Sequence, residues 1–104
     1  MTESSRRVPV MFSFDDESAR ADSWGRFTEL SATMATLSAR CELRLKDRLV
    51  LSFEVGGRTF SELACVATWV ETDKDGYTSA ELRFTDEVVK RRLAAALLDI
   101  LSRA

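Results

Sequence analysis

Side chains that carry out acid–base or metal chemistry are scarce in this chain of 104 residues. It has no histidine, so it lacks the usual general base and the commonest metal ligand. Its two cysteines, Cys41 and Cys65, lack CxxC spacing and fall at apolar positions of expected strands, which indicates buried free thiols. Acidic clusters at 15–17 and 73–75 lack the ligand spacing of an EF-hand loop. We therefore predict no catalytic residue, no metal site and no enzyme activity.

Composition and length favour one globular domain. Apolar residues make up 45% and charged residues 31% of the chain, which is ordinary for a soluble protein. The net charge of −2 gives no reason to expect DNA or RNA binding. The longest apolar run, 93–98, is far shorter than the ~20 residues that span a bilayer, so we expect no membrane insertion. The N-terminus has no apolar core of the signal-peptide kind, and we expect a cytoplasmic protein with a flexible tail at 1–5 and a single domain at 6–104.

Alternation of apolar and polar residues predicts several short strands. Gly56-Gly57 and the segment 73–76 predict hairpin turns, whereas the small residues at 31–38 predict an irregular or weakly helical connection. Trp69 is expected in the core. The predicted strands cover 8–14, 26–30, 40–46, 49–55, 58–70 and 77–84.

A single helix is predicted at the C-terminal end, over 86–102. Thr85 is a suitable N-cap, and Asp86 and Glu87 lie in the first turn, where the helix dipole favours acids. Strands followed by one helix indicate an α+β domain that is mainly β, most simply a small closed or nearly closed barrel. Periodicity alone does not separate a barrel from a sandwich.

Two short stretches resemble the signatures of the PilZ domain, a small bacterial module. Arg7-Val8-Pro9-Val10 resembles the end of a pattern in which two arginines are separated by three residues and are often followed by Val-Pro-Val. Glu29-Leu30-Ser31-Ala32-Thr33-Met34 resembles a pattern of Asp or Asn, any residue, Ser, two residues and Gly. Three positions depart from these patterns: Glu3 stands at the first arginine, Glu29 at the acid or amide, and Met34 at the glycine.

The resemblance implies a six-stranded antiparallel β-barrel with one C-terminal helix. Many family members bind cyclic di-GMP, whose phosphates and guanines suit planar cations, an acceptor for guanine N–H groups and a small residue. In this chain the resemblance assigns those roles to Arg6, Arg7, Glu29 and Ser31. Replacing an arginine by Glu3 costs at most about 4–5 kcal/mol, roughly a thousandfold in affinity.

The C-terminal helix carries a wider apolar arc than one contact requires. A stripe of Val89, Leu93, Ala96, Leu97 and Ile100 is expected on the barrel. Beyond it, Ala94, Leu98 and Leu101 indicate either a helix set deeply into its own barrel or a contact with a protein partner or a second copy.

Two further features have two interpretations each. Trp24 follows a charged loop, where it either anchors an interface or packs against the barrel rim. Lys90-Arg91-Arg92 is either a solvated face, paired with Asp86 and Glu87 at i, i+4 spacing, or a site for an acidic partner.

Two functional hypotheses follow from the resemblance. The first is a PilZ-like signalling adaptor that acts by protein contact through the C-terminal helix and the 15–25 loop, with cyclic di-GMP binding weak or lost. The second is a working cyclic di-GMP receptor. Either would regulate bacterial motility, pili or biofilm formation, and neither requires a cofactor.

Overall fold

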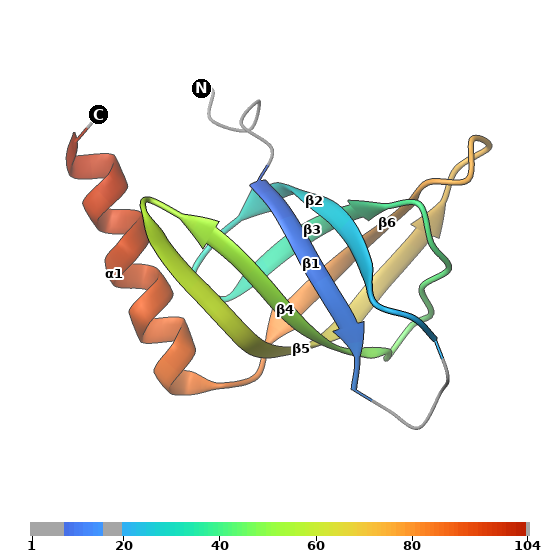
Figure 1. The fold of residues 1–104 in the computed structure, drawn as a ribbon, viewed down its shortest axis with the longest axis horizontal. Coiled ribbons are helices and arrows are strands. Elements are labelled where there is room, and N and C mark those ends of the chain that lie inside the picture. Colours follow the sequence, from blue (N-terminus) through green and yellow to red (C-terminus); the bar gives the residue numbers. More distant parts are fainter. Residues whose placement is uncertain (1–7, 16–19, 104) are drawn as a thin grey trace.

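Six antiparallel strands close into a barrel, and one helix lies against one end of it (Figure 1). The computed structural model describes residues 8–15 and 20–103, and it describes side chains in these ranges as far as Asp99. The expected tail at 1–5, with Glu3, and the expected ligand residues Arg6 and Arg7 lie outside the described residues. The elements are β1 Val8–Phe14, β2 Ser23–Leu30, β3 Met34–Ala39, β4 Arg48–Val55, β5 Arg58–Thr72, β6 Thr78–Phe84 and α1 Glu87–Arg103.

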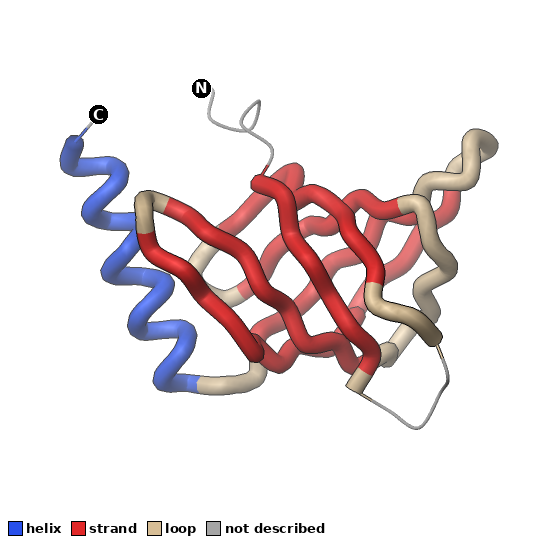
Figure 2. Tube along the Cα trace, in the orientation of Figure 1, coloured by secondary structure: helices blue, strands red, loops and turns tan. Residues whose placement is uncertain are grey.

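The strands follow one another around the barrel in the order β1-β2-β3-β6-β5-β4, and β1 closes it by pairing with β4. Figure 2 shows α1 alone at one end, whereas the longer loops gather at the other end. The predicted fold class, a mainly β α+β domain with six antiparallel strands and a C-terminal helix, is confirmed.

The barrel interior is filled by alternate side chains of the six strands, as a half-exposed sheet requires. One face of α1 completes this core, because Leu93 and Ala96 are buried and Val89 and Leu97 are partly buried. The stripe predicted for this helix is thus confirmed at these four positions. The largest fully buried apolar side chains are Phe12, Phe27, Leu37, Leu49, Leu51, Leu63, Leu82, Leu93 and Val10.

The run of small residues was expected to be an irregular connection, and this expectation is wrong for 34–39, which form β3. Its alternate residues Ala35, Leu37 and Ala39 are buried. Small side chains are needed there because β2 and β3 approach closely. A Cβ atom on Gly25 would lie 2.8 Å from both Leu37 Cδ1 and the Ser38 carbonyl oxygen.

The strand expected at 40–46 is also wrong, because this segment is a loop between β3 and β4. The Asp47 side chain accepts a hydrogen bond from Arg44 N at 2.8 Å, and Asp47 N donates back to the Arg44 carbonyl at 3.0 Å. Lys46 within this turn has a φ of 71°, in the left-handed region and outside the range of a regular strand. Leu43 is therefore buried while Leu45 is 59% exposed, contrary to the expected alternation.

Two further expectations are corrected. Trp69 is 46% exposed instead of buried, because a bulge between Ala67 and Trp69 shifts the register of β5 against β6.

The helix is capped by Asp86 and not by Thr85. Asp86 Oδ1 accepts hydrogen bonds from Val88 N and Val89 N at 2.9 and 3.4 Å, whereas the Thr85 hydroxyl donates to the Ala64 carbonyl.

Candidate functional site

The turn between β2 and β3 carries Ser31, and its hydroxyl group is fully used within the turn. Ser31 Oγ accepts hydrogen bonds from Met34 N at 3.2 Å and from Thr33 N at 3.4 Å. It donates its proton to the Met34 carbonyl at 3.1 Å. A serine hydroxyl has one proton and two lone pairs, so these three contacts fill its capacity. A ligand could bond to this hydroxyl only after the turn had opened.

Met34 and Glu29 flank this turn on the outer wall of the barrel. Met34 begins β3, is half-buried and lies opposite Arg83 of β6. Positive φ angles among the described non-glycine residues occur at Lys46 and Glu62, so the backbone at Met34 does not require glycine. Glu29 is exposed and pairs in register with Thr36. A bulky thioether and a carboxylate thus stand on the two sides of Ser31.

The first residue of β1 lies close to this turn. Val8 pairs with Phe27, and Glu29 follows two residues further along β2. The structure therefore brings Glu29 and Ser31 to the end of the barrel where β1 begins, which is also the end that α1 covers (Figure 1). Arg6 and Arg7, which precede β1 in sequence, are not described.

The face of α1 that points away from the barrel is partly apolar. Val88, Arg91, Ala95 and Leu98 are all exposed and recur at i, i+3, i+7 and i+10; we call them the outer stripe of α1. Leu98 is 67% and Val88 59% exposed, which excludes the interpretation that Leu98 is set deeply into the barrel. Ala94 is half-buried beside this stripe, and the Leu101 side chain is not described.

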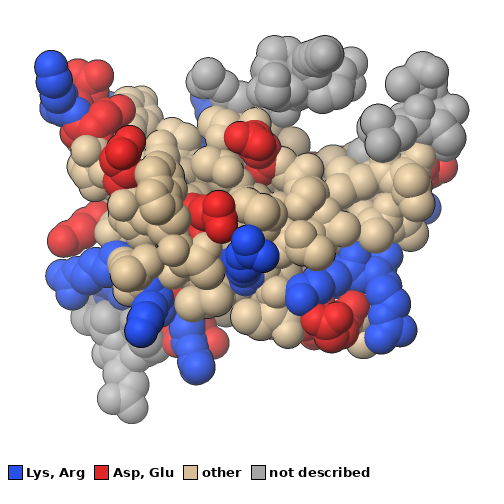
Figure 3. All heavy atoms as spheres, turned by 180° about the vertical axis from the view of Figure 1, so that it is seen from behind, with Lys and Arg blue, Asp and Glu red and all other residues tan. Residues whose placement is uncertain are grey.

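The basic cluster 90–92 is only partly paired as expected. Lys90 Nζ contacts Glu87 Oε2 at 2.6 Å, which is an i, i+3 pair and not the expected i, i+4 pair. Arg92 lies over the Phe60 ring, with 5.6 Å from Cζ to the ring centroid. In Figure 3, blue and red side chains are interspersed where α1 begins. This pattern favours a solvated, locally paired face.

Trp24 is 66% exposed, as expected for an interface residue, but it belongs to β2 and not to a loop. It lies near the start of β2, whereas the outer stripe of α1 lies at the opposite end of the barrel (Figure 1). The structure therefore does not bring Trp24 and Leu98 together on one surface.

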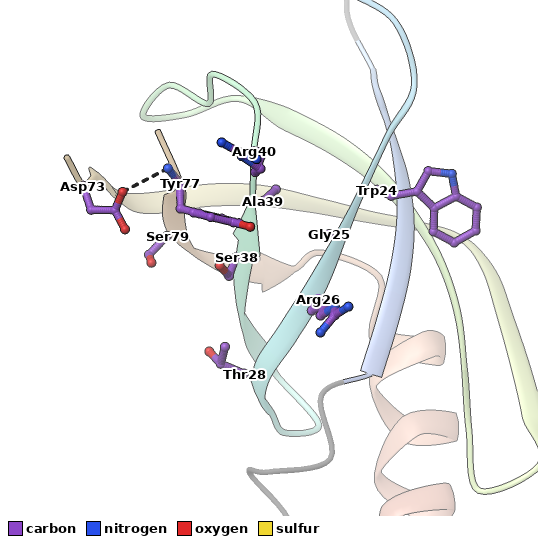
Figure 4. A pocket seen from close by; sticks show the side chains of 10 residues that line it. All are labelled: Trp24, Gly25, Arg26, Thr28, Ser38, Ala39, Arg40, Asp73, Tyr77 and Ser79. Carbon is purple, nitrogen blue, oxygen red and sulfur yellow. Dashed lines mark hydrogen bonds between the residues drawn. The ribbon is translucent and has the colours of Figure 1, made fainter. Parts of the chain in front are cut away.

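A hollow on the outer wall of β2, β3 and β6 was missed by the sequence analysis. It has a volume of about 680 Å³ and is shown in Figure 4. Arg26 of β2 and Arg40, which follows β3, both line it, although neither residue stood out in the sequence. No pattern around either residue in the sequence identifies them, because the hollow forms only when β6 lies beside β3. Its lining residues are Trp24, Gly25, Arg26, Thr28, Ser38, Ala39, Arg40, Asp73, Tyr77 and Ser79.

The two thiols are held protonated by their surroundings. Burial raises the pKa of the Cys65 thiol to about 12. Burial also raises the pKa of the half-buried Cys41 thiol, against the lowering effects of a hydrogen bond with Ser23 and of the Arg20 charge. Neither thiol has the depressed pKa of an activated nucleophile.

The described residues form neither a metal-binding cluster nor a membrane-spanning helix. Within 8–15 and 20–103, no group of three or more His, Cys, Asp or Glu side chains is placed to hold a metal ion. No helix in the described part of the chain is long and apolar enough to cross a membrane.

Comparisons with known proteins add no relatives. No family model matches the chain, and no curated protein matches its sequence.

Proposed function

We propose that this protein is a divergent PilZ-type signalling adaptor that acts by contact with a protein partner and binds cyclic di-GMP weakly or not at all. Three features support the family assignment: the six-stranded closed barrel, the C-terminal helix, and the position of the Glu29–Met34 stretch on the turn between β2 and β3. In this proposal the adaptor is a bacterial cytoplasmic protein linked to motility, pili or biofilm regulation, without enzyme activity and without DNA or RNA as a partner.

The single observation that most favours weak nucleotide binding is the closed hydrogen bonding of Ser31. Its hydroxyl would have to leave three contacts before it could bond to a guanine or a phosphate. Met34 adds bulk where the family pattern has glycine, and Glu29 adds a longer side chain where the pattern has Asp or Asn.

The outer stripe of α1 is the proposed contact surface for the partner. Leu98 and Val88 are exposed although the opposite face of the same helix is buried in the core. Apolar side chains grouped on one exposed helix face are typical of a contact surface. Arg91 within the stripe would favour a partner with a carboxylate near an apolar groove.

Titration with cyclic di-GMP, followed by amide NMR, tests the nucleotide half of the proposal. We expect no saturable shifts at micromolar ligand. A restored variant with Glu3→Arg, Glu29→Asp and Met34→Gly should gain roughly a hundredfold to a thousandfold in affinity, because it recovers a cation, the shorter acid and an open backbone. Ser31→Ala in the restored variant is the matched control and should remove most of the gain. Micromolar binding by the unaltered chain would contradict the proposal.

Two leucine-to-aspartate variants test the contact surface. Leu98→Asp should abolish association with a partner or a second copy, because a charge cannot be buried in an apolar contact without a large cost. Leu45→Asp is matched in exposure, 59% against 67%, and lies in the loop at the far end of the barrel. It should leave association unchanged. Light scattering reports the mass, and circular dichroism checks that both variants fold.

A working cyclic di-GMP receptor is the second candidate, and one observation favours it. Val8, the first residue of β1, pairs with Phe27, two residues before Glu29 on β2, so β1 begins at the same end of the barrel as Glu29 and Ser31. In that case Arg7→Ala should lower the nucleotide affinity at least about tenfold. The titration described above distinguishes the two candidates.

A further inference from the structure

The hollow on the outer wall of β2, β3 and β6 is a locally basic site on a chain whose net charge is −2. It extends along β2 from Trp24 to Thr28, the residue before Glu29, and its lining contains neither Ser31 nor any residue of the outer stripe of α1. Two guanidinium groups line it, those of Arg26 and Arg40. Its lining contains a single carboxylate, that of Asp73.

The Asp73 carboxylate is occupied by its own turn. Its Oδ1 accepts hydrogen bonds from Asp75 N at 2.8 Å and from Tyr77 N at 3.0 Å, the second of which is drawn in Figure 4. Backbone N–H dipoles aimed at this oxygen offset part of its negative charge. Asp73 is therefore a structural acceptor in the β5–β6 hairpin, and the two guanidinium groups outnumber this one carboxylate in the hollow.

Neither arginine has a carboxylate partner among the described residues. By contrast, Arg20, Arg44, Arg58 and Arg83 each contact an acid within 4.0 Å. Arg40 instead lies over the Tyr77 ring, with 5.0 Å from Cζ to the ring centroid. A guanidinium group held over an aromatic ring keeps its N–H groups available at its edges.

Strand register sets the spacing of the polar groups. Arg26 pairs with Ser38, and Ser38 pairs with Ser79, so that one rung across three strands carries a guanidinium group and two hydroxyls. Arg40 follows Ala39, the last residue of β3, and lies two residues beyond Ser38 along the chain. Both arginines therefore line the same hollow from neighbouring parts of the fold.

We propose that this hollow binds a small phosphate ester. Two forked cations and the hydroxyls of Ser38 and Ser79 supply donors from several directions, which suits the three free oxygens of a phosphate better than the two of a carboxylate. Trp24 lies at the edge of the hollow, 66% exposed, and its indole points away from Tyr77 (Figure 4).

Phenyl phosphate is the probe for this site, followed by amide NMR and by the indole N–H signal of Trp24. We expect saturable shifts at millimolar ligand, confined to 24–28, 38–40 and 77–79. Benzoate should bind at least about tenfold more weakly, because it offers a single charge and two oxygens. Absence of saturable shifts, or equal binding of benzoate, would overturn the proposal.

Arginine-to-glutamine variants locate the binding to this hollow. Arg26→Gln should weaken phenyl phosphate binding about tenfold, and the double variant with Arg40→Gln should weaken it further. Arg83→Gln is the matched control, since Arg83 projects from the outer wall of β6 outside the hollow and pairs with Glu81 at 3.5 Å. It should bind as the unaltered protein does. A double variant that retains full affinity would contradict the assignment.

Discussion

The two ends of the barrel are closed by different chemistry. At the end covered by α1, the Phe53 ring lies edge-on to Phe27 with 4.9 Å between centroids and stacks on Phe60 at 5.5 Å. Leu93 and Ala96 of α1 belong to the same buried cluster. This end is closed by apolar burial and aromatic packing, neither of which depends on the charge of a side chain.

The opposite end is closed by an ion pair. Arg20 donates to both carboxylate oxygens of Asp47, from Nη1 at 3.0 Å and from Nη2 at 2.9 Å, and its guanidinium group lies 3.8 Å from the Phe14 ring centroid. The two side chains are only 26% and 9% exposed. The pair fixes the chain before β2 to the loop before β4. The comparison shows that an apolar end can serve as a platform for a helix, whereas a directional contact can hold loops in position.

The apolar end should show the largest loss of stability. Phe53→Ala removes the ring between Phe27 and Phe60, and we expect a loss of about 3–5 kcal/mol in the free energy of unfolding, from lost burial and the resulting cavity. Urea denaturation measures it. Phe53→Leu refills much of the cavity, so its loss in the free energy of unfolding should be clearly smaller. Equal losses in the two variants would mean that the ring itself, and not its volume, holds this end together.

The end closed by the Arg20–Asp47 pair should show a smaller loss of stability. This loss should depend on whether residue 47 keeps an oxygen that can accept a hydrogen bond. Asp47→Ala removes the acceptor for the partly buried Arg20 side chain and for the exposed Arg44 N, and we expect a loss of about 2–3 kcal/mol, mainly from the Arg20 pair. Asp47→Asn keeps one oxygen and should lose less. If both variants unfold at the same denaturant concentration as the unaltered protein, this end does not depend on the ion pair.

Burial of Cys65 in the core makes the stability of the barrel depend on pH. Buried Cys65 keeps its proton up to a pKa of about 12, whereas in the unfolded chain it ionises from its ordinary value of 9.0. Between these values the native state binds the extra proton, so stability falls as pH rises, by about 1.4 kcal/mol per unit. The stability of the Cys65→Ala variant should fall less steeply between about pH 9 and about pH 11. Identical slopes in urea denaturation would contradict this account.

The smallest expected effect concerns the start of α1. Asp86→Ala removes the acceptor for Val88 N and Val89 N and should cost about 1 kcal/mol, because two N–H groups lose their partner. Thr85→Ala should cost less, since the Thr85 hydroxyl bonds to the Ala64 carbonyl, outside the helix. Thermal unfolding ranks the two variants, and a reversed order would restore Thr85 as the cap.

Local patterns were sufficient to predict most of the strands and the C-terminal helix, whereas the six-stranded barrel was predicted from the family resemblance. Gly56 and Gly57 have φ angles of 60° and 78°, which glycine adopts at no steric cost, so the sequence marks this hairpin directly. The stripe around Leu93 repeats at helical spacing and is buried as predicted. Each of these features is determined by residues close together in the chain.

The errors arose where distant segments decide the structure. β3 was missed because its small residues suit the narrow space beside Gly25, a requirement that comes from β2. The segment 40–46 alternates as a strand does, but the Asp47 side chain folds it into a turn. Trp69 was misplaced because a bulge cannot be read from alternation alone. Arg26 and Arg40 could not be grouped without knowing that β2, β3 and β6 are neighbours.

The strand order also constrains how the chain must fold. β3 pairs with β6 and β1 pairs with β4, so neither closing partner exists when the first three strands have been synthesised. A nascent chain at that stage presents two unpaired strand edges, which are sites for misassociation. Contacts so distant in sequence slow folding toward milliseconds to seconds. The finished barrel removes both edges at once, so the period of greatest risk for this protein ends only when β6 is in place.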